Sequence, residues 1–411
     1  MYLKRVLISN FKNIRTADLS FSSKINCISG NNGEGKTNLL DAIYYLSMTK
    51  SYFNSSDSYT FTFGENITAL NGSYVRSDRT EDKISLSIRS GGEKSVRKND
   101  KSYSRISEHI GTIPIVMVSP ADTYLINGSG EERRKFVNSI LSQVDKEYLR
   151  RIMRYNQLLA QRNKLLKMDH LSFELLETIN ERMAPDAAYI YRRRLELCNR
   201  LQQLIVQYYN QLSGDKESVS LKYVSDLDEF VNNSASPIAQ SQDFPTEADL
   251  LNDNIADEPD QSLPSQSDMA LMYLFDKVKE RDSILRYTSA GIQRDDVEFS
   301  LGEHPIKRCG SQGQQKSFLI ALKLAQFTLM KELHGCTPIL LLDDVFDKLD
   351  MQRVEYLLGL VASEEFGQIF ITDSNKVRME KIASSITDNV ASFEVVSGVY
   401  SNGRSNNVNS D

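Results

Sequence analysis

The sequence predicts an α/β fold in which one phosphate-binding layer is assembled from both ends of the chain. Strand-like and helix-like segments alternate through the C-terminal third, a pattern typical of layers that contain parallel strands. Near the N-terminus, the glycine-rich segment Gly30–Thr37 stands between a strand-like and a helix-like segment. A second apolar strand, Ile339–Leu342, ends in two aspartates about 300 residues later. We therefore expect a large segment to be inserted between two halves of one phosphate site.

The individual elements are expected from the spacing of apolar residues, with a period of two for strands and about 3.6 for helices. The first part of the chain is predicted to be strands with one helix, and from Pro120 the pattern becomes helical. The expected strands cover 2–9, 24–29, 59–63, 68–75, 83–88, 113–118, 297–301, 338–342 and 368–371. The expected helices cover 37–48, 149–167, 173–209, 269–285, 314–333 and 352–362.

The composition of the chain limits the classes of protein to which it can belong. The 411 residues, 40% hydrophobic and 25% charged, are typical of a globular protein with about two to three domains. The apolar runs are far shorter than the ~20 residues of a membrane span, and the N-terminus lacks the pattern of a secretory signal. The four cysteines and four histidines are scattered, which gives little support to a zinc site or a disulfide framework. We expect a cytoplasmic protein without a membrane partner.

Charge is distributed unevenly along the chain. Residues 226–268 contain 11 acidic residues and no Lys or Arg, and we interpret them as a largely disordered insert. This insert is either a solvated loop or an acidic mimic that competes with DNA for a basic surface. Residues 133–200 contain 15 basic and 8 acidic residues. They either bind phosphate backbones through counterion release or form a solvated helix face with intramolecular ion pairs.

The strongest motif is Gly30-Asn31-Asn32-Gly33-Glu34-Gly35-Lys36-Thr37, which matches the pattern G-x-x-x-x-G-K-[ST] at every defined position. In this pattern the loop and the start of the next helix hold phosphates, so we expect all eight residues to bind ATP. Lys36 would neutralise charge on the β- and γ-phosphates, and Thr37 would coordinate Mg²⁺. The alternative is a chance match in a Gly/Asn turn, against which the strand–loop–helix context argues.

The second half of the site is expected at the end of the strand 338–342. Asp343 would hold Mg²⁺ directly or through water, and Asp344 would polarise the attacking water. A further anion site is expected where Ser311-Gln312-Gly313-Gln314-Gln315 begins a long helix. One ATP does not need two such sites on one chain. We therefore predict a head-to-tail dimer in which Ser311, Gly313 and Gln314 contact the partner's ATP; the alternative is an ordinary helix cap.

Together these motifs resemble the ATP-binding-cassette class of ATPases that includes the SMC proteins. Shorter segments resemble sequence motifs of the RecF family, namely 8–14, 119–129, 133–136, 155 with 161–167, 291–296 and 311–316. The sequence departs from the family pattern at Ala121, Gly130, Asn138, Gln293 and 347–350. None of these departures removes a residue of the phosphate loop, the metal site or the Ser311 motif.

The resemblance implies an ABC-type head, with a mixed phosphate-loop sheet and an antiparallel β subdomain, made of residues 1–122 and 287–411. Residues 123–286 would form an inserted helical arm that contains the insert 226–268. The resemblance also implies a slow, Mg²⁺-dependent, DNA-stimulated ATPase that acts as a conformational switch, with Lys36 and Asp344 as catalytic residues.

The same resemblance implies partners. The chain would form an ATP-dependent homodimer on double-stranded DNA at ssDNA/dsDNA junctions, and would support replication, gap repair and RecA loading with RecO and RecR. It also favours the DNA interpretation of the basic helices. The positions singled out for DNA contact are Arg133, Arg134, Arg150, Arg151, Arg154, Arg162 and Lys164.

Two other classes of function are compatible with a phosphate loop. An SMC-like structural DNA tether would need long heptad arms, and the helical stretch here is short and interrupted. A small-molecule kinase or a transporter ATPase subunit would need an acceptor lid or a membrane partner. The Ser311 motif and the basic helices argue against this second class.

Overall fold

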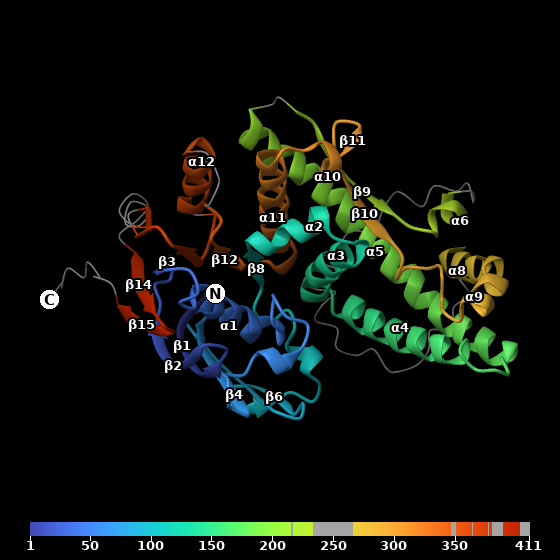
Figure 1. The fold of residues 1–411 in the computed structure, drawn as a ribbon, viewed down its shortest axis with the longest axis horizontal. Coiled ribbons are helices and arrows are strands. Elements are labelled where there is room, and N and C mark those ends of the chain that lie inside the picture. Colours follow the sequence, from blue (N-terminus) through green and yellow to red (C-terminus); the bar gives the residue numbers. More distant parts are fainter. Residues whose placement is uncertain are drawn as a thin grey trace.

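The computed structural model describes residues 1–214, 217–232, 266–346, 351–363, 365–376, 378–379 and 389–402. Most of the acidic insert, 233–265, and the turn 347–350 lie outside the described residues, as do the roles predicted for them. The N-terminal strands and the strands that end at residue 402 lie on one side of the molecule, and helices extend to the other side (Figure 1).

A six-stranded sheet forms the centre of the molecule. Its order is β15 (Val399–Asn402), β14 (Val390–Val396), β3 (Ile25–Ser29), β13 (Ile369–Asp373), β12 (Ile339–Asp343) and β8 (Ile115–Val118). All neighbours are parallel except β15, which pairs antiparallel with β14. Every residue of β3, β12 and β13 is buried, because layers cover both faces of the sheet.

One face of the central sheet packs on helix α1 (Lys36–Met48) and on a second, antiparallel sheet. The second sheet has the order β2 (Ile14–Ser20), β1 (Tyr2–Phe11), β4 (Ile67–Val75), β5 (Glu81–Arg89), β6 (Lys94–Lys98) and β7 (Lys101–Ser102). Burial alternates along β5, as expected for a sheet with one face in solvent. Helix α1 is almost wholly buried because it lies in the core between the two sheets.

The other face of the central sheet packs on helices, so that alternate residues of a strand belong to different cores. Leu341 faces the α1 side, whereas Leu340 and Leu342 face the helical side. Besides α1, the described α-helices of the molecule, of which only some reach the sheet, are α2 (Thr123–Asn127), α3 (Gly130–Val144), α4 (Lys146–Leu165), α5 (Phe173–Ser213), α6 (Asp228–Asn232), α8 (Gln266–Lys277), α9 (Lys279–Leu285), α10 (Ile306–Cys309), α11 (Gln312–His334) and α12 (Met351–Ala362). Short 3-10 turns cover Asp57–Tyr59, Ile106–His109 and Pro120–Asp122.

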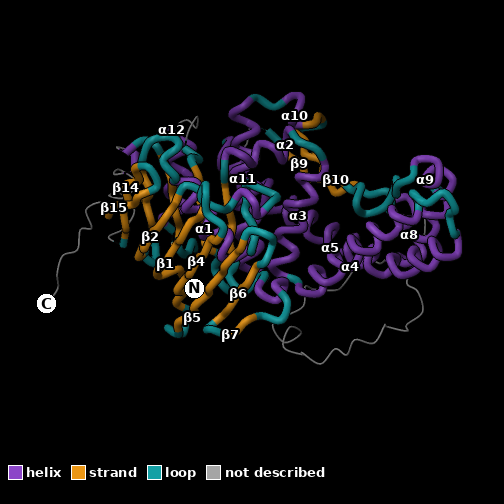
Figure 2. The backbone as a smooth tube through the Cα atoms, turned by 60° about the horizontal axis from the view of Figure 1, so that its bottom comes forward, coloured by secondary structure: helices purple, strands orange, loops and turns teal. Residues whose placement is uncertain are grey.

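A small antiparallel sheet joins the helical part to the C-terminal part. It consists of β9 (Val219–Val224), β10 (Asp296–Leu301) and β11 (His304–Pro305), in the order β11-β10-β9. Figure 2 shows most strands gathered at one side of the molecule and the helices at the other. Since β9 precedes residue 287 and β10 follows it, this sheet ties the two predicted domains together; the division into domains stays a prediction.

Most predicted elements are confirmed, with ends shifted by one to several residues. The strand expected over 59–63 is wrong: the segment contains a 3-10 turn, and Phe61 forms a single bridge with Phe11. The helix expected over 269–285 is two helices, α8 and α9, that meet at Val278. The sequence analysis did not predict β2, β6, β9, β14 or β15.

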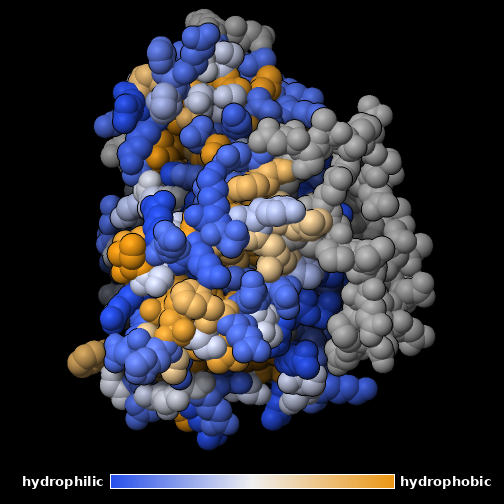
Figure 3. All heavy atoms as spheres, turned by 90° about the vertical axis from the view of Figure 1, so that its right-hand side faces the viewer, coloured by the Kyte–Doolittle hydropathy of each residue, from blue (hydrophilic) through white to orange (hydrophobic). Residues whose placement is uncertain are grey.

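The far end of the helical part consists of the turn between α4 and α5 together with α8 and α9 (Figure 1). Figure 3 looks onto this end, where mostly hydrophilic residues surround patches of hydrophobic ones. Exposed large apolar side chains on these elements include Met168, Phe173, Leu175 and Ile284. None of the helices that the structure describes has the length and apolar character needed to cross a membrane.

Candidate nucleotide-binding site and basic helices

Two glycines shape the loop between β3 and α1. Gly35, at the N-cap of α1, has a φ of 116°, and a Cβ there would lie 2.8 Å from the side-chain amide of Asn13. A Cβ on Gly30 would lie 2.6 Å from the carbonyl oxygen of Val395. Both positions therefore require glycine. No side chain caps the start of α1, so its first backbone N–H groups are left for an anion.

The ammonium group of Lys36 is held by the loop itself. Its Nζ atom donates to the carbonyl oxygens of Gly30, at 2.8 Å, and Asn31, at 3.1 Å. The side chain is buried although it is charged. Among the described residues its hydrogen-bond acceptors are carbonyl oxygens, so this buried ammonium favours an anion beside it, and the phosphate groups of ATP would supply that charge.

The hydroxyl of Thr37 and the carboxylate of Asp343 meet at the edge of the central sheet. Thr37 Oγ1 donates to Asp343, at 2.9 Å from Oδ1 and 3.1 Å from Oδ2. Thr372, at the end of β13, donates its own hydroxyl to Asp343 Oδ1 at 2.8 Å. Burial and the neighbouring Asp344 raise the pKa of Asp343, and the hydroxyl bonds and Lys36 oppose that rise. A hydroxyl beside a buried carboxylate is the ligand pair that Mg²⁺ takes in phosphate-loop sites, so the residues fit this ion.

Asp344 follows the strand in an unusual backbone conformation. Its φ is 45°, in the left-handed region that non-glycine residues seldom adopt. Its backbone N–H lies 3.1 Å from the hydroxyl of Thr372 and 3.3 Å from the carbonyl oxygen of the same residue. Thr372 therefore holds both aspartates, although the sequence analysis missed it. A threonine at the end of a predicted buried strand was the one available signal.

The remaining residues of the loop are either exposed or in contact with the C-terminal strands. Asn31, Asn32 and Gly33 are exposed, whereas Glu34 accepts a hydrogen bond from the backbone of Ser397 through its carboxylate. The hydroxyl of Tyr400 donates to the carbonyl oxygen of Gly35 at 2.9 Å. The turn between β14 and β15 thus supports the loop from the C-terminal side, a contact that the sequence analysis did not foresee.

Ser311 is the N-cap of α11 and forms a capping box. Its hydroxyl accepts from the backbone N–H of Gln314 at 3.2 Å, and the Gln314 side chain accepts from the backbone N–H of Ser311 at 2.6 Å. Gln314 also donates to Glu217 at 2.6 Å. Beside the cap, Arg353 Nη1 lies 3.1 Å from the place of a Cβ on Gly313.

Ser311 is exposed, and the start of α11 next to α10 lies apart from the start of α1 in Figure 1. One chain therefore does not bring its own Ser311 motif to its own phosphate loop. The capping role that was the alternative interpretation is present, and the contact with a partner's ATP stays a prediction.

The basic positions differ sharply in their surroundings. The prediction that Arg162 contacts DNA is corrected by the structure. Its side chain is 0% exposed and forms an ion pair with Asp282 at 2.7 Å, so DNA cannot reach it. Arg133 pairs with Asp296 at 2.6 Å, and Arg134 donates to the backbone of Asp295 at 2.7 Å. These two arginines join α3 to β10.

The cluster on α4 is more open. Arg150 and Arg151 pair with Glu147, and Arg154 pairs with the buried Asp186, yet both Arg150 and Arg154 remain partly exposed. Lys164 is exposed and has no ion-pair partner among the described residues. Intramolecular ion pairs therefore account for part of the basic charge, as the alternative interpretation held.

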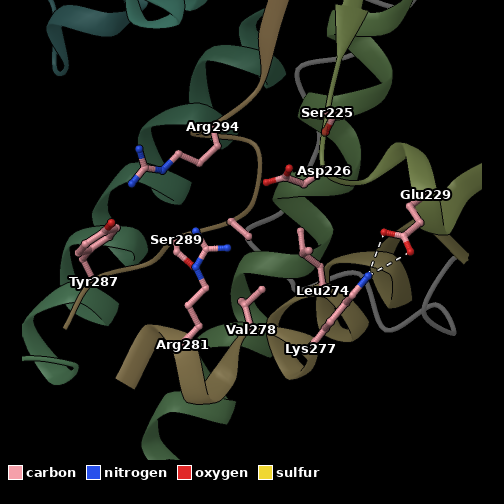
Figure 4. Close-up of a pocket in the computed structure, with 11 residues that line it drawn as sticks. Ser225, Asp226, Glu229, Leu274, Lys277, Val278, Arg281, Tyr287, Ser289 and Arg294 are labelled. Atoms are coloured by element: carbon pink, nitrogen blue, oxygen red, sulfur yellow. Dashed lines mark hydrogen bonds and ion pairs between the residues drawn. The ribbon is translucent and has the colours of Figure 1, made fainter. Parts of the chain in front are cut away.

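Two arginines that the sequence analysis did not single out line a cavity of about 580 Å³ near the far end of the helices. Figure 4 shows the side chains of Arg281, Arg294, Asp226 and Ser289 around this cavity, and Lys277 bonded to Glu229. Within the described ranges neither arginine has a carboxylate partner.

Known proteins resemble this chain over nearly its whole length. A sequence model described as "RecF/RecN/SMC N terminal domain" matches residues 2–396. The chain is 40% identical over 398 residues to the DNA replication and repair protein RecF of Parabacteroides distasonis, covering 97% of this chain and 98% of that one. The chain belongs to the RecF family. The protein of the same name from Flavobacterium johnsoniae is 40% identical over 389 residues, or 94% of this chain and 97% of that one.

Solved structures agree with the assignment to RecF. The structure described as "recombination mediator protein RecF-ATP in RecFOR pathway" has a TM-score of 0.81 at 26% identity and covers 98% of each chain. A Pyrococcus furiosus Smc head domain has a TM-score of 0.52 at 15% identity, with 98% of this chain and 96% of that chain covered, and shares the fold alone. The predicted family and the predicted ABC-type, SMC-like head are confirmed, and RecF is favoured over an SMC-like tether.

Proposed function

We propose that this RecF-family chain binds and hydrolyses ATP in order to control its assembly on DNA during replication and repair. One observation carries the proposal: Thr37 and Asp343, which are 306 positions apart, are hydrogen-bonded beside the buried ammonium of Lys36. The names of the relatives and of the RecF-ATP structure support it.

The residues of the site divide the work of phosphoryl transfer. The loop 30–37 holds the phosphates, and Lys36 neutralises charge on the β- and γ-phosphates. Thr37 and Asp343 would hold Mg²⁺, which when bound neutralises phosphate charge. Asp344, fixed by Thr372, orients and deprotonates the attacking water. Because aspartate reaches less far than glutamate, we expect slow hydrolysis, suited to a switch.

The exposed Ser311 motif provides the link between ATP and assembly. In a head-to-tail homodimer, Ser311, Gly313 and Gln314 of one chain would contact the γ-phosphate bound by the other. ATP then favours the closed dimer only through its higher affinity for that form, and hydrolysis removes the contact.

DNA would bind along the helical part by way of its phosphates, so that binding is independent of sequence, sensitive to salt and able to stimulate hydrolysis. The exposed cations of α4, Arg150, Arg154 and Lys164, are the first candidates for contact. In the cytoplasm the dimer would act at ssDNA/dsDNA junctions and support RecA loading with RecO and RecR.

Sedimentation of the full chain with gapped DNA, with and without Mg²⁺-ATP, tests the proposal. We expect an ATP-dependent dimer on DNA for the unaltered protein and none for Lys36→Met. Lys83→Met, which removes an exposed lysine from β5, is the matched control and should behave as the unaltered protein does. A monomer indifferent to both ATP and DNA would overturn the proposal.

A further inference from the structure

A second cavity of about 630 Å³ lies at the opposite end of α1 from the phosphate loop. The 13 residues of α1 separate the two sites by roughly 20 Å along the helix. Three parts of the chain contribute aromatic side chains to this cavity: Tyr44, Tyr52 and Phe53 from α1 and its following loop, Tyr124 from α2, and Phe136 from α3. We call it the aromatic pocket. Its volume is within the ~300–1,000 Å³ range of small-ligand sites.

The inner aromatic side chains pack against one another and against Lys323, whose Nζ atom lies 5.4 Å from the ring centroid of Tyr52 and 5.3 Å from that of Phe136. The rings of Tyr44 and Tyr52 meet edge to face at 5.0 Å, and those of Tyr52 and Phe53 at 5.3 Å. Tyr124 lies at the rim and is 64% exposed, which is unusual for a side chain of its size. An exposed tyrosine over an aromatic-walled cavity offers a face on which a planar ring can stack.

The side of the pocket formed by α11 carries an amide that lacks a partner. Gln326 is only 4% exposed, and its Oε1 atom has no hydrogen-bond partner in the part of the chain that the structure describes. Its Nε2 atom makes one long contact, 3.7 Å, with the sulfur of Met330. Buried amides are normally satisfied, so this one is available to a ligand that presents both a donor and an acceptor.

The charges that line the pocket leave one cation in excess. Lys323 and Asp122 form a buried ion pair at 2.8 Å, and Lys135 pairs with Glu132 at 3.0 Å. Lys50 has no ion-pair partner among the described residues. Desolvation by the surrounding protein and the charge of Lys135 lower the pKa of Lys50, although the residue is exposed at the rim. An anion beside the two lysines would relieve the repulsion between them.

We propose that the aromatic pocket takes one unpaired nucleotide of a DNA strand. Its base stacks on the exposed ring of Tyr124, the hydrogen-bonding edge of the base reaches Gln326, and its phosphate lies at Lys50. Only an unstacked base fits this chemistry, because the edges and faces of a paired base are already engaged. The inference rests on the proposed function and extends it: the pocket would let the protein distinguish a gap from continuous duplex.

The test compares two DNAs with the full-length protein in Mg²⁺-ATP, by fluorescence anisotropy. One is a continuous duplex, and the other carries a single-stranded gap with 2-aminopurine as its first unpaired base. We expect Tyr124→Ala to weaken binding of the gapped DNA about five- to tenfold and to leave duplex binding unchanged. Gln326→Leu should act in the same direction, and 2-aminopurine emission should change when the unaltered protein binds. Tyr59→Ala, at another exposed tyrosine, should have no effect.

The outcomes separate the two proposals. If the unaltered protein binds neither DNA, the proposed function fails and the inference fails with it. If it binds duplex and gapped DNA, and Tyr124→Ala and Gln326→Leu bind both as the unaltered protein does, the inference alone is overturned. Free 2-aminopurine nucleoside monophosphate is a further arm: a response to it without any response to the gapped strand would assign the pocket to a free nucleotide instead.

Discussion

Thr37 Oγ1 donates a hydrogen bond to Asp343 Oδ1 at 2.9 Å, across 306 positions of sequence. This contact brings the phosphate loop and the carboxylate strand to the same edge of the central sheet. It depends on β13, which lies between β3 and β12 and supplies Thr372 to the same carboxylate. The contact therefore holds the two side chains that we propose as magnesium ligands next to each other.

Asp343→Asn should remove the stabilisation that Mg²⁺ adds to the nucleotide complex, because the amide carries no charge for the ion. At a ligand concentration of a hundred times Kd, the lost stabilisation is about 2.7 kcal/mol. Thermal unfolding with a non-hydrolysable ATP analogue, with and without Mg²⁺, measures it. Thr372→Val, which keeps the carboxylate, should retain most of the Mg²⁺ effect; an undiminished effect in Asp343→Asn would remove this residue from the metal site.

Ser311→Ala should lose about 1 kcal/mol of stability through the missing cap and should also lose ATP-dependent dimerisation. Ser172→Ala is the matched control, since Ser172 caps α5 by accepting from the backbone of Leu175. Both variants should unfold at similar urea concentrations. Sedimentation with Mg²⁺-ATP separates them, and equal dimerisation of the two would reduce Ser311 to a helix cap.

Arg162→Met should destabilise the fold by about 3–5 kcal/mol, because it leaves Asp282 buried without its ion-pair partner. Lys164→Met, two residues away and exposed, should change stability by less than about 0.5 kcal/mol. For DNA binding we expect the opposite order, with the larger effect from the substitution of Lys164. Lys164→Met should reduce the slope of log K against log salt by about one, in binding titrations at several salt concentrations.

Stability should fall as the pH drops below about 6.5, the ordinary pKa of histidine. Burial lowers the pKa of His109 and of His334, so the unfolded chain binds more protons than the folded one below that pH. The contribution of these two histidines to the free energy of unfolding is complete above pH 6.5. It is lost as the pH falls toward their lowered pKa values in the folded protein. Urea unfolding at pH 7.5 and 5.5 tests this; His109→Gln should be less stable at pH 7.5 and less sensitive to pH.

Gly30→Ala should abolish ATP binding and destabilise the head, because the added methyl group would lie 2.6 Å from a carbonyl oxygen of β14. Gly359→Ala is the control: none of the described atoms lies within 4 Å of a Cβ at this position in α12, and alanine should stabilise the helix by about 0.5–1 kcal/mol. Isothermal titration with ATP and urea unfolding distinguish the two variants. Unchanged ATP affinity in Gly30→Ala would contradict the requirement for glycine.

That the phosphate loop and the carboxylate strand lie together was largely predictable, because each lies in a contiguous segment of sequence. The loop 30–37 and the pair Asp343–Asp344 each combine a fixed pattern with a buried strand, and both patterns are visible locally. Thr372 and Tyr400 were not predictable, since they act through contacts between distant strands. The strand β14 was missed for the same reason: its partner β3 lies about 365 residues away. The strand β15 pairs with β14 at the edge of this sheet.

The basic helices show the opposite case. The count of charges along the sequence singled out both Arg162 and Arg150 as DNA contacts. In the structure Arg162 is buried with Asp282, whereas Arg150 is partly exposed. Whether an arginine faces solvent depends on which acidic residue the fold brings to it, and Asp282 is 120 residues from Arg162. The aromatic pocket was hidden likewise, because its five aromatic residues come from three separate parts of the chain.

The position of β3 in the central sheet has a consequence for synthesis on the ribosome. Both neighbours of this strand, β13 and β14, are translated more than 300 residues later. At about 5–20 residues per second, β3 has no partner on either side for roughly 20–70 s. An apolar strand with two open edges is prone to aggregate during that time, and the early packing of α1 on the N-terminal sheet would shield it. The phosphate loop that follows β3 gains its contacts with Ser397 and Tyr400 only after these last strands have been translated.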